Sequence, residues 1–179
     1  ITSDAKNDWI IKTPVPNIVL AEDKISKDIY REAGYKNVEL MDKIYRYHYL
    51  KDIKRNNSQN IVLICPGLHD GKSLLKKLYP TIVNNPNKKY LLKPHPRSSV
   101  FKWGIPKEYS NKNLGIGSQH ISNYLETVSE VIVTYSSVGL EAYMLGINVT
   151  LVCLANKINE SPLLDLYEKN DKKNIDIIW

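Results

Sequence analysis

The sequence predicts an α/β fold, built on a mostly parallel, Rossmann-like sheet with helices on both faces. The first observation is a continuous apolar run at residues 60–65, closed by a Pro-Gly pair, which is typical of a buried parallel strand. Comparable apolar runs recur at residues 90–92, 130–134 and 148–154. Segments with helical spacing of apolar residues lie between these runs, and strands that alternate with helices indicate a parallel sheet.

The region before residue 60 is less regular. Residues 1–17 contain two prolines and little periodicity, so we predict a linker or a crossing segment there. Apolar runs at 18–21 and 37–41 are predicted strands. Residues 26–33 between them have helical character, and this helix should end at Gly34, because glycine tolerates the left-handed conformation that follows a helix. We predict a single domain over residues 18–179.

A tyrosine-rich stretch follows, with Tyr45, Tyr47 and Tyr49 at alternate positions. Aromatic side chains bury a large area and are more often packed than used for binding. We therefore predict packing, in the core or between domains, rather than ligand stacking.

Residues 72–79 carry leucines at helical spacing, and Pro80 is expected to end or kink that helix, because proline lacks a backbone N–H and its ring clashes with the preceding turn. The remaining predicted elements are a short edge strand at 113–117, a helix at 121–128, a helix at 138–145 closed by Gly146, a helix at 162–169 with proline near its start, and a last apolar run at 175–178.

The composition excludes several classes of protein. With 179 residues, 42% hydrophobic and 25% charged, the chain is typical of one globular domain. No apolar run approaches the roughly 20 residues of a membrane-spanning helix, and no charged-then-apolar leader opens the chain, so we expect a cytoplasmic protein. The first residue is Ile1 rather than Met, and Trp179 ends the chain inside an apolar run, so we expect both ends to be cut.

The charge pattern bears on partners. The net charge is +6, but the basic residues are scattered, without a basic stripe interleaved with aromatics, which argues against a nucleic-acid partner. Peripheral association with the anionic inner face of the plasma membrane stays open. Cys65 and Cys153 lie in apolar segments and are predicted to be reduced, buried thiols. The four histidines and two cysteines show no metal-ligand spacing, so we expect no metal and no cofactor.

Ligands of an open parallel sheet lie at the carboxyl ends of its strands, so the residues that follow each strand are candidates for binding. Small, hydroxylated and cationic residues follow the predicted strands. Strand by strand, the candidates are Gly67; then Lys93, His95, Pro96 and Arg97; then Gly117 and Ser118; and then Ser136 and Ser137. Their convergence on one rim predicts a ligand that carries phosphate.

Ser136 and Ser137 stand directly before a predicted helix, where free N–H groups hold phosphate readily and two hydroxyls add donors. The alternative is an ordinary serine N-cap, which stabilises a helix by about 1 kcal/mol. Glu141 lies one helical turn after Ser137, where it is either an acceptor for ribose hydroxyls or a solvated side chain. Gly139 in the first turn, where glycine disfavours a helix, indicates that something approaches closely.

His95 lies between two prolines, which restrict the backbone and help to aim the imidazole. It is a candidate to donate to a phosphate oxygen or to act as an acid or base near neutral pH. The alternative is a hydrogen-bonded loop histidine. The neighbouring Lys93 and Arg97 favour an anion site.

Residues 67–73 resemble a P-loop, but three residues separate the glycines where the phosphate cradle needs four. We therefore reject an NTPase motif. The strand, glycine turn and helix still make a plausible donor-site loop, with Gly67 as its best candidate.

These residues carry a resemblance to a family. The His95-Pro96 and Ser136-Ser137 pairs, each after a strand and about 40 residues apart, resemble the His-Pro and Ser-Ser motifs of bacterial sialyltransferases, polysialyltransferases and Kdo transferases of the GT-B fold. The stretch 135–142 is also similar to a segment of capsule-polysaccharide transferases. The resemblance covers residues 18–165, and only the two short motifs are specific.

The resemblance implies that the chain is the C-terminal, nucleotide-sugar-binding half of a GT-B glycosyltransferase that builds a bacterial surface polysaccharide. It implies a CMP-activated donor, with the His-Pro element on CMP, the Ser-Ser hydroxyls on its phosphate, and no metal requirement. It also implies that the general base and the glycan acceptor site belong to an N-terminal domain outside this chain. The chain alone should then bind donor without turning it over.

Two other interpretations stay open. Glycerophosphotransferases of teichoic acid synthesis look similar in fold and motifs, and use CDP-glycerol. From a different class, the chain could be a non-catalytic binding domain that retains the same residues.

Overall fold

The structure is a computed structural model and describes residues 16–22, 24–41, 45–56, 60–99, 101, 104–155, 157, 161–168 and 174–179. The chain forms two compact units, and the boundary lies between Tyr49 and Leu50. This boundary differs from the single domain that the sequence predicts from residue 18. Among the described residues, the strands of the first unit hydrogen-bond to each other and not to the large sheet of the second. Residues 1–15 of the predicted linker lie outside the described residues.

The first unit contains a β-α-β element made of β1 (Val19–Ala21), α2 (Lys24–Glu32) and β2 (Val38–Leu40). The two strands are parallel, with Val19 opposite Val38. The helix ends as predicted at Gly34, whose φ of 97° lies in the left-handed region. The Tyr35 N–H donates to the carbonyl of Tyr30 over 3.1 Å, which satisfies one of the carbonyls that a helix end leaves without a partner.

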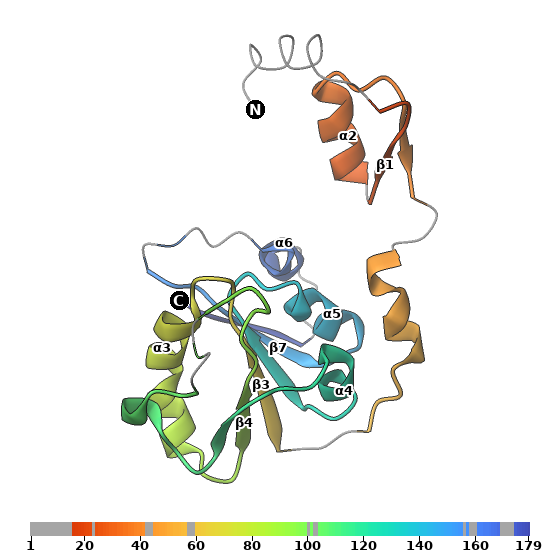
Figure 1. Ribbon diagram of the computed structural model, residues 1–179. Helices are drawn as coiled ribbons and strands as arrows, with labels where there is room; N and C mark the ends of the chain where they lie inside the picture. Colours follow the sequence, from red (N-terminus) through yellow and green to blue (C-terminus); the bar gives the residue numbers. More distant parts are fainter. Residues whose placement is uncertain are drawn as a thin grey trace. The chain divides into compact units, whose positions relative to one another are not determined.

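The second unit is a six-stranded, fully parallel sheet (Figure 1). The 3-10 helix η1 (Tyr45–Asp52) crosses the boundary into it. Its further elements are β3 (Ile61–Cys65), α3 (Gly71–Asn84), β4 (Lys89–Leu92), η2 (Lys107–Tyr109), β5 (Leu114–Ile116), α4 (Ile121–Leu125), β6 (Glu130–Val133), α5 (Val138–Met144), β7 (Asn148–Val152), α6 (Pro162–Glu168) and β8 (Ile175–Ile178). The strand order β5-β4-β3-β6-β7-β8 is that of the Rossmann sheet, which confirms the predicted fold class.

Helices cover both faces of this sheet. Alternate strand residues point to opposite faces, and one face of β3 and β4 packs against the leucines of α3 in a common core. Figure 1 shows α3 on one side of the sheet and α5 with α6 on the other. On that second side, a side chain at Gly139 of α5 would meet Val133 of β6 and Leu163 of α6.

Pro80 does not end α3, so of the two outcomes predicted from the sequence, an end or a kink, the end is wrong. The helix continues to Asn84, with Pro80 inside it. Leu78 and Ile82, on either side of the proline, are both buried in the core. Burial of the last turn outweighs the loss of the one hydrogen bond that proline cannot donate. The predicted helix at 121–128 is also shorter and ends at Leu125, although turn hydrogen bonds from Thr127 and Val128 to Tyr124 follow it.

The remaining predictions for the second unit concern single features. Gly146 closes α5 with a φ of 69°, as predicted. Cys65 and Cys153 are both buried and free of disulfides, as predicted. Within the described ranges, no helix is long and apolar enough to cross a membrane. Nor does that part of the chain gather three or more His, Cys, Asp or Glu side chains that could hold a metal ion.

Candidate functional site

The strand order of the sheet reverses at β3, which has β4 on one side and β6 on the other. Loops on either side of such a reversal run in opposite directions, which leaves a crevice at the carboxyl ends of the strands. Here the ends of β3 and β6 are joined, because the Gly67 N–H donates to Thr134 Oγ1 over 2.8 Å in a buried hydrogen bond. This bond links the two strand ends beside the crevice.

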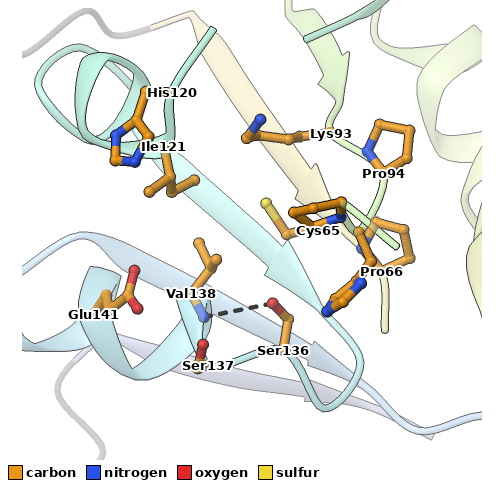
Figure 2. Close-up of a pocket in the computed structure, with 12 residues that line it drawn as sticks. Cys65, Pro66, Lys93, Pro94, His120, Ile121, Ser136, Ser137, Val138 and Glu141 are labelled. Carbon is orange, nitrogen blue, oxygen red and sulfur yellow. Dashed lines mark hydrogen bonds between the residues drawn. The ribbon is translucent and has the colours of Figure 1, made fainter. Parts of the chain in front are cut away.

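A cavity of about 290 Å³ lies at this reversal, at the small end of the range for ligand sites. Its lining comes from the ends of β3, β4 and β6 and from the starts of α4 and α5. The lining residues are Cys65, Pro66, Lys93, Pro94, His95, Pro96, His120, Ile121, Ser136, Ser137, Val138 and Glu141. Figure 2 shows His120, Ile121 and Glu141 on one side of it, and Lys93, Pro94 and Pro66 on the other.

Six residues singled out in the sequence meet in this cavity: Lys93, His95, Pro96, Ser136, Ser137 and Glu141. They come from positions up to 48 residues apart and meet in one cavity because β4 and β6 flank β3. Four other candidates do not line it, namely Gly67, Arg97, Gly117 and Ser118.

Lys93 is held in place at the carboxyl end of β4. Its ammonium Nζ donates to the carbonyl of Gln119 over 2.7 Å and lies 5.9 Å from the centre of the Tyr124 ring. An ammonium has three donor hydrogens, so the contact with Gln119 leaves capacity for a ligand anion. Lys93 can therefore supply a fixed positive charge to the cavity.

His95 begins a tight turn, closed by a 2.8 Å hydrogen bond from the Ser98 N–H to its carbonyl. Pro96 occupies the second position of that turn, which its fixed φ suits. The Arg97 N–H donates to His95 Nδ1 over 3.2 Å. Because Nδ1 acts as acceptor, a neutral imidazole carries its proton on Nε2, which is then a donor.

Ser137 lies at the N-cap position of α5, but its side chain makes no capping hydrogen bond. The ordinary N-cap interpretation therefore does not hold for Ser137. The hydroxyl of Ser136 accepts a long hydrogen bond of 3.4 Å from the Val138 N–H (Figure 2). Both serines are half-buried, and Glu141, one turn later, is only 7% exposed, so the solvated alternative does not hold for its carboxylate.

Cys65 lies in the lining between the two walls. Burial raises the pKa of its thiol to about 12, while the nearby Lys93 ammonium lowers it and the Glu141 carboxylate raises it. The thiol is therefore neutral near pH 7. A nucleophilic cysteine needs a lowered pKa, so this environment does not activate Cys65.

His120 and Ile121 are lining residues that the sequence analysis did not identify. His120 is the N-cap of α4, where its Nδ1 accepts from the Ser122 N–H over 3.4 Å. It lies two residues after the Gly117-Ser118 pair that follows the edge strand. The signal in the sequence was a histidine directly before a predicted helix, on the same rim as the other candidates.

Gly67, Gly117 and Gly139 allow close packing, because a Cβ at each position would come too near a neighbouring side chain. A side chain at Gly67 would overlap the ring of Tyr135, and one at Gly117 would lie 3.0 Å from the Tyr124 hydroxyl. At Gly139 a Cβ would lie 2.7 Å from Leu163 Cδ1 and 2.8 Å from Val133 Cγ2. The close approach that Gly139 indicates is therefore the packing of α5 on the sheet and not a ligand.

The cavity combines donors with one carboxylate. Lys93, His95, His120 and the two serine hydroxyls can donate to an anion, whereas Glu141 can only accept when ionised. Such a set suits a ligand that has a phosphate at one place and hydroxyl groups at another.

No family model matches the sequence, and no curated protein matches it. Among solved structures, the chain is similar to the beta Kdo 2,7 transferase KpsC of Thermosulfurimonas dismutans, with a TM-score of 0.38 and 24% sequence identity. The match covers 59% of this chain and 38% of that chain, so this chain spans well under two thirds of the transferase. The chemistry of the cavity, rather than this likeness, carries the functional assignment.

Proposed function

We propose that the chain is the donor-binding half of a glycosyltransferase and that its cavity binds a nucleotide-activated sugar. The observation that carries this proposal is the meeting of Lys93, His95 and the Ser136-Ser137 pair in one cavity at the reversal of strand order. In open α/β sheets this is the position at which nucleotides bind.

Each side chain has a role in this proposal. The hydroxyls of Ser136 and Ser137 and the His95 Nε2–H donate to the phosphate, and the Lys93 ammonium balances its charge. Glu141, four residues after Ser137, accepts from hydroxyl groups of the nucleoside.

Transfer forms a bond between the anomeric carbon of the sugar and an acceptor oxygen, which gives its proton to a base. The bond between that carbon and the phosphate oxygen breaks, and the nucleotide leaves with an added negative charge on its phosphate. Donors fixed before the reaction stabilise that charge in the transition state. In this proposal, another domain supplies the base that activates the acceptor and the site that binds the glycan acceptor. This chain then binds donor but transfers nothing alone.

The resemblance of the His95-Pro96 and Ser136-Ser137 motifs favours a CMP-activated sugar, such as CMP-sialic acid or CMP-Kdo. Calorimetric titration of the chain with CMP, CDP, UMP and UDP tests this choice. We expect CMP to bind most tightly. Tightest binding of a uridine nucleotide would refute the CMP assignment but would still support a nucleotide-binding site. Tightest binding of CDP would favour CDP-glycerol as the donor. Failure to bind any of the four nucleotides would refute the donor-binding function.

A further inference from the structure

We propose that Tyr135 is a stacking platform for the ring of the transferred sugar, at the mouth of the cavity; this inference rests on the proposed function. The ring of Tyr135 lies against the backbone of Gly67, so closely that any side chain at position 67 would overlap it. Yet the residue remains 42% exposed, although it is large and apolar. One side of the ring thus lies against backbone, and part of the residue is open to solvent.

The position of Tyr135 relates it to the cavity. It directly precedes Ser136, and Gly67, on which its ring rests, directly follows Pro66; both Ser136 and Pro66 are lining residues. Neither Tyr135 nor Gly67 is itself a lining residue, so the ring lies next to the lining at the Pro66 side. His120 and Glu141 lie on the opposite side in Figure 2.

This arrangement sets a direction for the donor. With the phosphate at Ser136 and Ser137 and the nucleoside hydroxyls at Glu141, the group on the far side of the phosphate extends toward Pro66 and Tyr135. That group is the one transferred. Tyr135 would contact it and leave the nucleotide untouched.

The backbone under the ring is anchored, which favours stacking. The Gly67 N–H donates to Thr134 Oγ1 over 2.8 Å, so the backbone under the ring is tied to the residue next to Tyr135. An aromatic side chain has few rotatable bonds, so it binds a flat or cyclic partner at little cost in conformational entropy. A sugar ring presents a face of C–H groups to such a platform, whereas a glycerol chain does not. The geometry thus favours a cyclic donor group over the glycerol of CDP-glycerol.

The test compares CMP with CMP-N-acetylneuraminic acid and CDP-glycerol, titrated into wild type, Tyr135→Ala and Tyr135→Phe. We expect Tyr135→Ala to lower the affinity for the CMP-sugar by roughly tenfold, which is the effect of losing a good aromatic contact. The affinities for CMP and CDP-glycerol should change by less than about twofold. Tyr135→Phe keeps the ring and should bind like wild type. Tyr30→Ala is the matched control, because Tyr30 is 40% exposed and belongs to the other unit.

Gly67→Ala gives a second, independent variant. Its methyl group must displace the Tyr135 ring, so it should reproduce the selective loss of CMP-sugar affinity while Tyr135 is still present. An equal loss for CMP and the CMP-sugar in Tyr135→Ala would overturn the platform and leave the proposed function intact. An unchanged affinity for the CMP-sugar would do the same. Failure of wild type to bind CMP or any nucleotide would instead refute the proposed function.

Discussion

The backbone N–H of Gly67 donates to the side-chain hydroxyl of Thr134, over 2.8 Å and out of contact with water. This bond joins the ends of β3 and β6, the two strands at which the strand order of the sheet changes direction. The loops beyond it separate and leave the cavity between them. The bond lies one residue from Pro66 and two residues from Ser136, both of which line the cavity.

Thr134→Val should lower the free energy of unfolding by about 1–3 kcal/mol. Valine has the same shape as threonine but no hydroxyl, so the buried Gly67 N–H loses its acceptor. Thr134→Ser keeps the hydroxyl and should recover much of the stability. Urea denaturation of the two variants measures the difference. Equal stability of wild type and Thr134→Val would show that the bond does not support the base of the crevice.

Gly139→Ala should destabilise the chain by about 1–3 kcal/mol, since its Cβ must force Val133 or Leu163 to move in a packed region. Helix propensity alone predicts the opposite sign, a gain of up to about 1 kcal/mol. The matched control is Gly115→Ala, where the nearest atom would be an ordinary 3.6 Å away. Thermal or urea unfolding that finds Gly139→Ala more stable than wild type would contradict the packing role.

His95→Ala should weaken CMP binding by about 10-fold to 100-fold, the loss of one hydrogen bond to a charged group. Arg97→Ala should change it by less than about threefold, because Arg97 is exposed, lies outside the lining, and meets His95 only through its backbone N–H. Calorimetry of both variants gives the comparison. A larger loss of CMP affinity in Arg97→Ala than in His95→Ala would indicate that the anion site lies outside the cavity.

Alkaline pH should destabilise the chain through Cys65. Its pKa is about 12 in the folded state against an ordinary 9.0, so the folded state keeps a proton that the unfolded state loses. The stabilisation is therefore complete below pH 9 and decreases between pH 9 and 12, by about 1.4 kcal/mol per pH unit at most. Urea unfolding at pH 8 and pH 10, with fresh reductant, should show a drop about 1 kcal/mol larger in wild type than in Cys65→Ala. Identical drops would contradict the buried, neutral thiol.

Much of the fold follows from local patterns. The apolar runs around β3, β4, β6 and β7 were identifiable because strands buried on both faces leave few polar positions. Gly34 and Gly146 marked helix ends through their left-handed backbone. The predicted end of the helix at Pro80 was wrong, because the proline rule concerns one lost hydrogen bond, whereas the burial of Ile82 depends on tertiary packing that local sequence does not contain.

The site was less accessible from the sequence. Residues after a strand lie on the correct rim, but their side chains turn toward the cavity or away from it according to the loop. Lys93 and Glu141 turn toward it, whereas Gly67 lies under Tyr135 and Gly117 against Tyr124. His120 reaches the cavity as the cap of a helix that crosses over from the edge strand. Its place depends on the strand order, which no local motif specifies.

A crystal structure of the chain with CMP tests the central claim most directly. We predict the phosphate within hydrogen-bond distance of the Ser136 and Ser137 hydroxyls, with the nucleoside on the side of Glu141. A second cavity of about 380 Å³, lined in part by Lys88, Lys89 and Lys112, offers positive charge elsewhere on the sheet. CMP found there, or at no defined position while Ser136 and Ser137 remain without ligand, would contradict the assignment of a donor site to the reversal of strand order.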